Sequence, residues 1–294
     1  SYYTRRIEML WLFFAIASAF FAGVTAILAK IGVKKTDSTV ATAIRTAVIL
    51  LFSWLLVFLT GAQASLAHVD GKTLLFLILS GLSTGASWLF YFKALVNGDV
   101  NKVAPIDKSS TILTILLAFL LLGEPVTPGK GAGIIVMALG TFLMLERRGA
   151  VKSGEKKNWL LYAVLSAVFA SLTAILGKVG ITHIDSNLGT AIRTAVVLVM
   201  AWAMVFITRK QGEIRHIDRK SWIFICLSGV TTGLSWLCYY RALQSGQASI
   251  VVPIDKLSIV VTVALSWLFL KERLTKKSFL GLILIIAGTF CLLI

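Results

Sequence analysis

The chain contains the stretch LSGLSTGASWLFYFKAL at residues 79–95 and a second copy, LSGVTTGLSWLCYYRAL, at residues 227–243. Two shorter pairs accompany it in the same order: TAIRTAV at 42–48 and 190–196, and PIDK at 105–108 and 253–256. All three pairs have the same offset of 148 positions, from 79 to 227 as from 42 to 190. No insertion separates the matches, so we expect the two halves of the chain to share one fold.

The composition is that of a membrane protein. Of 294 residues, 57% are hydrophobic and 14% are charged, and the mean hydropathy is +0.88. Soluble domains carry about 25% charged residues. Apolar runs long enough to cross a bilayer fill most of the chain, which excludes a large soluble domain. The net charge of +16 does not indicate nucleic acid as a partner, because most of the bases lie in short segments between apolar runs.

We predict an all-α, polytopic membrane protein with ten transmembrane helices in two five-helix repeats. The predicted spans are 9–31, 38–60, 73–95, 101–122, 129–146, 158–179, 186–208, 221–243, 249–270 and 278–294. Because each repeat holds an odd number of spans, the second must cross the membrane in the opposite direction, which makes the repeats inverted. The predicted domains are a first repeat at 1–146, a charged linker at 147–157 and a second repeat at 158–294.

The basic residues predict how the chain is oriented. Most lysines and arginines outside the spans lie in the loops that follow the first, third, fifth, seventh and ninth spans. The positive-inside rule places these loops in the cytoplasm and both termini outside it, in a cell inner (plasma) membrane. Arg5 and Arg6, before the first span, argue the other way.

Charged residues within the predicted spans are the first candidates for a functional site, because ionisable groups are costly at membrane depth. They are four bases and two acids: Arg45, Asp107, Lys108, Arg193, Asp255 and Lys256. PIDK also has a structural interpretation, since proline suits the first turn of a helix and an early aspartate favours the helix dipole. On that interpretation, each aspartate only pairs with the arginine of its own repeat.

Even with those pairs formed, two lysines remain without an acid. They are Lys108 and Lys256, one in each PIDK segment. A buried ammonium without a partner either loses its proton or binds an anion. We therefore expect these two lysines to contact a substrate or to control access to it.

Aromatic residues recur within the third and eighth spans. Trp88 and Tyr91 are repeated as Trp236 and Tyr239. The indole N–H of a tryptophan inside a span needs a polar partner or a wet cavity. Two interpretations stay open: these rings line a central cavity, or they pack between helices beside glycines that let the helices approach closely.

Several kinds of chemistry are not indicated. The sequence has no HExxH, no GxGxxG, no P-loop and no cysteine or histidine spacing typical of a metal site. The three cysteines are scattered through apolar segments. We expect no catalytic residues, no metal and no cofactor.

The order of these motifs resembles the EamA-type drug/metabolite transporter superfamily. The resemblance is carried by GASWLFYFKAL and GLSWLCYYRAL, then VAPIDK and VVPIDK, then LLLGE and LFLKE. It covers nearly the whole chain, which looks like two five-span units fused. It implies a basket of ten helices in which spans one to four and six to nine line a cavity that opens to each side in turn. Spans five and ten would lie at the periphery, where they could support a homodimer.

Two features depart from the family pattern. Many ten-span members keep both termini in the cytoplasm, and the Asp-Lys pair after the proline is not general. Members move amino acids, other metabolites, drugs, nucleotide sugars or sugar phosphates, so the resemblance does not name one substrate.

The sequence thus predicts a secondary active transporter, an exporter, for a small organic metabolite that is anionic or zwitterionic. Lys108 and Lys256 would meet its anionic group, and the four aromatic residues would form the wall. Arg45 with Asp107, and Arg193 with Asp255, would act as supports, gates or coupling groups. The alternatives are a flippase for a lipid-linked phosphate or sugar, and an integral membrane enzyme acting on a lipid phosphate.

Overall fold

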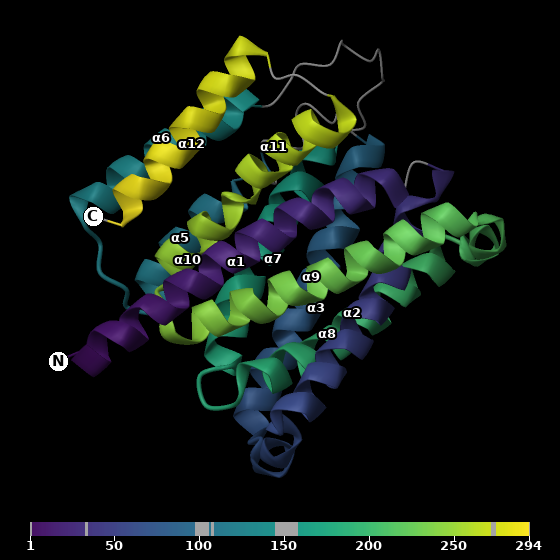
Figure 1. The fold of residues 1–294 in the computed structure, drawn as a ribbon, viewed down its shortest axis with the longest axis horizontal. Coiled ribbons are helices and arrows are strands. Elements are labelled where there is room, and N and C mark those ends of the chain that lie inside the picture. Colours follow the sequence, from purple (N-terminus) through teal and green to yellow (C-terminus); the bar gives the residue numbers. More distant parts are fainter. Residues whose placement is uncertain are drawn as a thin grey trace. The chain divides into compact units, whose positions relative to one another are not determined.

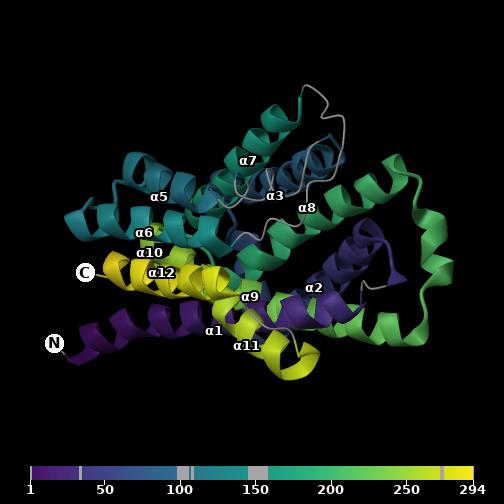
Figure 2. The same cartoon turned by 90° about the horizontal axis from the view of Figure 1, so that it is seen from above.

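The computed structural model describes residues 2–32, 35–97, 106, 109–144, 158–271 and 275–293, and this part of the chain is helical and contains no strand (Figures 1 and 2). The helices are α1 (Tyr2–Gly32), α2 (Ser38–Thr60), η2 (Ala62–His68), α3 (Gly71–Asn97), α5 (Ser110–Leu121), α6 (Pro128–Met144), α7 (Trp159–Gly180), α8 (Ser186–Ile207), η3 (Gln211–His216), α9 (Arg219–Ser245), α10 (Ala248–Lys256), α11 (Ser258–Leu270) and α12 (Lys276–Leu292). Each predicted span overlaps a helix, and the ninth is divided into α10 and α11. In the fourth predicted span, residues 101–105, 107 and 108 lie outside the described residues. The all-α prediction is confirmed.

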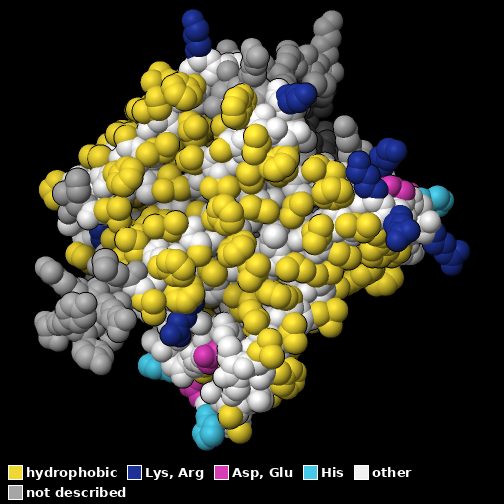
Figure 3. All heavy atoms as spheres, in the orientation of Figure 1, with side chains coloured by type: hydrophobic (Ala, Val, Ile, Leu, Met, Phe, Trp, Pro, Cys, Tyr) yellow, Lys and Arg dark blue, Asp and Glu magenta, His cyan; other side chains and the backbone are white. Residues whose placement is uncertain are grey.

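The helices have the length and surface of membrane spans. In the described part of the chain, seven segments are long and apolar enough to cross a bilayer, and α5 and α6 are shorter apolar helices. Large apolar side chains point outward, including Leu51, which is 73% exposed, and Leu120, which is 78% exposed. Hydrophobic side chains cover most of the face shown in Figure 3, and the charged ones lie mainly at its margins. The protein is therefore a polytopic membrane protein.

The helices group into two compact units, and each unit takes helices from both sequence repeats. The first consists of Ser1–Leu82, Leu176–Gly246 and Ser258–Lys271. The second consists of Ser83–Ile175, Gln247–Leu257 and Glu272–Ile294. Helices α3 and α7 each begin in one unit and end in the other.

Inversion of the repeats is visible in the second unit, where α6 packs along α12 (Figure 1). A Cβ atom on Gly133 would lie 2.7 Å from the carbonyl oxygen of Gly288, and one on Gly140 would lie 2.6 Å from that of Gly281. The residue number rises along α6 as it falls along α12, so the helices are antiparallel. Since α12 is the copy of α6 at an offset of 148, this confirms that the second repeat runs upside down.

The first unit repeats this arrangement with α2 and its copy α8. Val57, near the end of α2, and Ala62, the first residue of η2, form one apolar cluster with Leu188 and Ala191, at the start of α8. The end of one helix therefore meets the start of its copy, so this pair is also antiparallel.

Two equivalent glycines also bring helices together in the first unit. Gly81 of α3 lies against Val196 of α8, and Gly229 of α9 lies against Val48 of α2. Each contact is the copy of the other, because both partners shift by the same offset. The expectation that small residues in the third and eighth spans allow close helix approach is confirmed at these positions.

The second PIDK segment does not start a helix, so that interpretation of the motif is wrong for this copy. Pro253 is the sixth residue of α10, and Lys256 is the last. A turn at Leu257 separates α10 from α11. Proline is poorly suited to the middle of a helix because it lacks the N–H that would continue the hydrogen-bond ladder. Asp255 and Lys256 thus lie beside a break in the ninth span.

The α6–α12 contact gives a prediction with a control on the same helix. Gly140→Ala places a methyl group 2.6 Å from the Gly281 carbonyl oxygen and 2.8 Å from the backbone nitrogen of Ile285. We expect a loss of about 1–3 kcal/mol in unfolding free energy, measured by thermal unfolding in detergent. Gly131→Ala meets no atom within 4 Å, so its stability should be unchanged or raised by up to about 1 kcal/mol. Equal effects of the two substitutions would contradict this packing.

Candidate functional site

The candidate site in the first unit is built on one face of α9. Thr232, Trp236 and Tyr240 are spaced four residues apart, so they lie on nearly the same side of the helix over about 12 Å. We call these three residues the α9 stripe. Two arginines from the inverted helices α2 and α8 contact it.

Arg45 contacts the start of the α9 stripe. It lies in α2, whose first turn is capped by the side chain of Asp37. The Nη2 group of Arg45 donates a hydrogen bond to the Thr232 hydroxyl oxygen at 2.8 Å. The Nε atom of Arg45 is buried and has no hydrogen-bond partner among the described residues. One neutral hydroxyl is therefore the hydrogen-bond partner that the structure assigns to this cation.

Arg193, the copy of Arg45, contacts the other end of the stripe and is enclosed. Only 1% of its surface is exposed. Its guanidinium lies over the ring of Tyr240 at 4.7 Å and over the ring of Trp236 at 5.3 Å, and its Nε donates to the Ser80 hydroxyl at 3.2 Å. These cation–π contacts hold α8 against α9.

The helices that supply the stripe, the two arginines and Ser80 carry positive charge without acids. The sequences of α2, α3, α8 and α9 contain no aspartate or glutamate within the helix. Arginine stays protonated at any physiological pH. Arg45 and Arg193 are therefore permanent cations on helices that contain no acid.

Other predicted site residues lie in or beside the second unit's helices, or lie outside the described residues. Tyr91 packs in a cluster with Ala94, Ala163, Trp159 and Tyr162. The remaining positions are as follows: Trp88 is half-buried on α3, Asp255 is half-buried and Lys256 exposed at the end of α10, and Asp107 and Lys108 fall outside the described residues.

The first unit supplies the remaining aromatic site residue, Tyr239, whose ring packs edge-on against that of Tyr240 at 5.2 Å. Arg193 and Asp255 belong to different units, and Asp107 is not described, so the two predicted Arg–Asp pairs stay predictions. The structure brings Arg193 and Trp236 together, and the role of Trp236 as a substrate wall also stays a prediction.

Sequence reasoning missed a polar anchor at the start of α10. The carboxylate of Glu124 accepts hydrogen bonds from the backbone N–H groups of Ala248 at 2.6 Å and Ser249 at 2.9 Å. Lys130, 3% exposed, donates to the Gln247 side chain at 2.7 Å and to the Pro125 carbonyl at 2.9 Å. An acid at a helix N-terminus is favourable. The glutamate that ends the LLLGE motif is the one sequence signal for this anchor.

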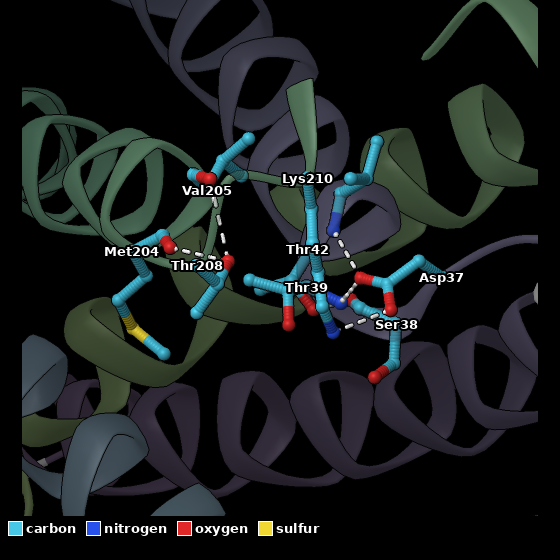
Figure 4. A network of polar contacts seen from close by, with 9 residues as sticks. Asp37, Ser38, Thr39, Thr42, Met204, Val205, Thr208 and Lys210 are labelled. Carbon is cyan, nitrogen blue, oxygen red and sulfur yellow. Dashed lines mark hydrogen bonds and ion pairs between the residues drawn. The ribbon is translucent and has the colours of Figure 1, made fainter. Parts of the chain in front are cut away.

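A second polar connection joins α2 to the segment after α8 (Figure 4). One carboxylate oxygen of Asp37 accepts from the backbone N–H groups of Thr39 at 2.9 Å and Val40 at 3.2 Å. The other forms an ion pair with the Lys210 ammonium at 2.6 Å. The same side chain therefore caps α2 and fixes the chain that leaves α8.

This ion pair has no counterpart at the equivalent position of the other repeat. Asp185, the copy of Asp37, caps α8 through the N–H groups of Asn187 and Leu188. The position equivalent to Lys210 is Ala62, which is buried against Leu188. The two ends of the α2–α8 pair are therefore closed differently: Ala62 packs against Leu188 at one end, and Lys210 forms an ion pair with Asp37 at the other.

The surroundings of Asp37 shift its titration. Burial alone raises the pKa of its carboxyl group, but the hydrogen bond from Lys210, the backbone N–H groups of Val40 and Thr39, and the charge of Lys210 together hold the pKa below its usual value. A carboxyl group with a lowered folded-state pKa stabilises the protein above its unfolded-state pKa, about 4. That contribution is lost as the pH falls through the folded-state value.

Asp37 and Asp185 give a matched pair of substitutions. Asparagine also caps helices well, so Asp37→Asn and Asp185→Asn both keep the cap, and only the first removes an ion pair. We expect Asp37→Asn to cost about 0.5 kcal/mol more, because partly exposed ion pairs contribute little. Thermal unfolding at low salt measures this difference, which should shrink in about 0.5 M NaCl and below pH 4. Equal losses under all conditions would show that the ion pair does not contribute.

Comparison with known proteins agrees with the repeated architecture. The model of the EamA-like transporter family matches residues 9–146 and, a second time, residues 157–294. An uncharacterized transporter from the cobO 3′ region of a Sinorhizobium sp is 44% identical over 136 residues, which are 46% of this chain and 96% of that relative. That relative is therefore about as long as one repeat.

More distant proteins match most of the chain. The uncharacterized transporter YxxF of Bacillus subtilis is 24% identical over 204 residues, which are 69% of this chain and 64% of that protein. A solved crystal structure superposes with a TM-score of 0.74 at 16% identity and covers 97% of this chain and 96% of that one. At that identity, the superposition shows a shared fold and no shared substrate.

Proposed function

Since the chain belongs to the EamA-like transporter family, we propose that it is a secondary active transporter that exports a small anionic or zwitterionic metabolite by alternating access. The membrane-spanning helices support transport, and the inverted repeats support access from either side in turn. The expectation of resemblance to this family is confirmed. The substrate, the direction and the mechanism are parts of this proposal.

The observation that carries the anionic preference is the charge on the helices that supply the α9 stripe, the two arginines and Ser80. Helices α2 and α8 each place an arginine there, and α2, α3, α8 and α9 contain no acid. A site with this charge favours anions and disfavours hydrophobic cations. In the second unit, Lys256 is an exposed base at the break in the ninth span.

The orientation that we propose places Arg209 and Lys271 in the cytoplasm. Both residues adopt the left-handed conformation, with φ values of 55° and 54°. Their copies in the first repeat are Gly61 and Gly123, with φ values of 74° and 64°. Glycine adopts this conformation without strain, whereas a residue with a Cβ atom pays about 1–2 kcal/mol.

The strained bases follow the seventh and ninth spans, and the glycines follow the second and fourth. Odd and even spans end on opposite sides of the membrane. The two copies of an inverted duplication must differ in charge if the chain is to insert in one orientation. Bases in place of glycines on one side of the membrane agree with this requirement of the positive-inside rule. Both termini would then lie outside the cytoplasm.

The transport proposal is tested in proteoliposomes. A radiolabelled panel of carboxylates, phosphate esters, zwitterions, neutral sugars and hydrophobic cations is offered under an imposed pH or solute gradient, without nucleotide. We expect saturable uptake of a negatively charged or zwitterionic compound, reduced by at least about tenfold in Lys108→Met and Lys256→Met, since an ion pair lost in a low-dielectric site costs about 1.4 kcal/mol or more. Movement of hydrophobic cations alone would contradict the proposal, and movement of a lipid-linked phosphate alone would favour a flippase.

The orientation proposal is tested with C-terminal reporters. Alkaline phosphatase, active only outside the cytoplasm, should be active on the wild-type chain, and a fluorescent protein that folds in the cytoplasm should be dark. Arg209→Gly with Lys271→Gly removes two bases and relieves strain, so we expect a mixed population with stability unchanged or raised by about 1 kcal/mol. A bright cytoplasmic reporter on the wild-type chain would overturn this orientation.

A further inference from the structure

The two arginines of the repeated TAIRTAV segment have diverged in their surroundings. Arg193 is 1% exposed, it is stacked by Trp236 and Tyr240, and it donates to the Ser80 hydroxyl. Two rings and a hydroxyl enclose its guanidinium. This arginine is built into the contact of α8 with α9 and α3.

Arg45 has a different environment. Its side chain is partly exposed, and its one described hydrogen bond runs from Nη2 to the Thr232 hydroxyl at 2.8 Å. That hydroxyl donates its own hydrogen bond to the Ser228 carbonyl oxygen at 2.6 Å, so it can only accept a hydrogen bond from Arg45. The Nε–H of Arg45 is buried without a partner in the described part of the chain.

A guanidinium in this state is poorly satisfied. It cannot lose its proton, and a single hydroxyl does not balance its charge. A buried donor without an acceptor is costly, and that cost is removed when an acceptor arrives. A carboxylate or phosphate offers two oxygens that match the fork formed by Nε–H and a neighbouring Nη–H.

We propose that Arg45 binds the oxyanion, a carboxylate or a phosphate, of the transported metabolite, and that Arg193 is a positioning residue that holds α8 against α9. This inference rests on the proposed function, and it adds the group that recognises the substrate. It also gives the two copies of one motif separate roles. Of the two arginines, the one on α2 binds the oxyanion, whereas the one on α8 fixes the position of its helix.

The matched substitutions Arg45→Gln and Arg193→Gln test this division in the full-length protein in nanodiscs. The probes are succinate and glutamate for carboxylates, glycerol 3-phosphate for phosphates, and glycerol and putrescine as neutral and cationic controls. Ligand-induced shifts in the unfolding temperature give the affinity of each. We expect at least one oxyanion class to stabilise the wild-type protein. Stabilisation by succinate or glutamate indicates a carboxylate site, and stabilisation by glycerol 3-phosphate indicates a phosphate site.

Arg45→Gln should lower the affinity for that oxyanion at least tenfold. The unfolding temperature without ligand should stay unchanged or rise. Arg45→Lys should recover only part of the affinity, because an ammonium lacks the planar fork. Arg193→Gln should lower the unfolding temperature without ligand and change the affinity of the folded protein less than threefold. If Arg193→Gln does not fold, Arg193→Lys gives the same comparison.

The outcomes separate this inference from the proposed function. If no oxyanion stabilises the wild-type protein or is transported by it, the anionic transport proposal fails, and this inference fails with it. If an oxyanion binds and Arg45→Gln leaves its affinity within threefold, only the role of Arg45 is overturned.

A persistent ion pair between Arg45 and Asp107 would also overturn it. In that case Arg45→Gln would lower the unfolding temperature without ligand, and adding Asp107→Asn would restore it. We expect the double variant instead to show the same loss of oxyanion affinity as Arg45→Gln.

Discussion

Close contact between helix backbones at glycine is the constraint on which this fold depends. Gly140 and Gly281 face one another so closely that a Cβ atom on either would lie 2.6 Å from the carbonyl oxygen of the other. Apolar helices gain nothing from leaving lipid for one another, so they associate through such packing and through hydrogen bonds. Because α6 and α12 are copies related by inversion, the same two glycines of each repeat supply both sides of this interface. Duplication thus preserves the packing without further change.

Polar contacts are released from that symmetry, because the two copies of a residue lie at opposite faces of the membrane. Asp37 and Asp185 cap their helices in the same way, yet among the described residues Asp37 alone forms an ion pair with a lysine. Arg209 occupies a backbone position that suits its glycine copy better. The proposed orientation in the membrane, the closure of the two ends of the α2–α8 pair and the proposed substrate recognition each require the two membrane faces of the protein to differ. The apolar packing contacts are equivalent in the two repeats, whereas the charged residues at the helix ends differ between them.

Hydropathy and the repeat predicted most of the fold, since a bilayer demands apolar segments of a set length and a constant offset demands equal halves. The break at Leu257 was not predictable in that way, because hydropathy indicates a single span over Ala248–Phe269 in spite of Asp255 and Lys256, and Pro253 is the sequence feature that weakens the helix backbone there. The burial of Lys130 was not predictable either, because it depends on acceptors at Gln247 and Ser249, more than a hundred residues further along. The stacking of Arg193 likewise depends on which face of α9 turns toward α8.

The ninth span shows why PIDK has to be explained by more than helix initiation. Its N-terminal half, α10, is fixed at its start by the Glu124 carboxylate, which satisfies two N–H groups that a helix start leaves free. Its C-terminal half, α11, belongs to the other compact unit. Asp255 therefore lies near the C-terminus of a short helix, where the helix dipole disfavours an acid and favours the adjacent Lys256. The helix dipole alone therefore does not explain an acid at this position, and the gating or coupling role expected for Asp255 beside the break in the ninth span stays a prediction.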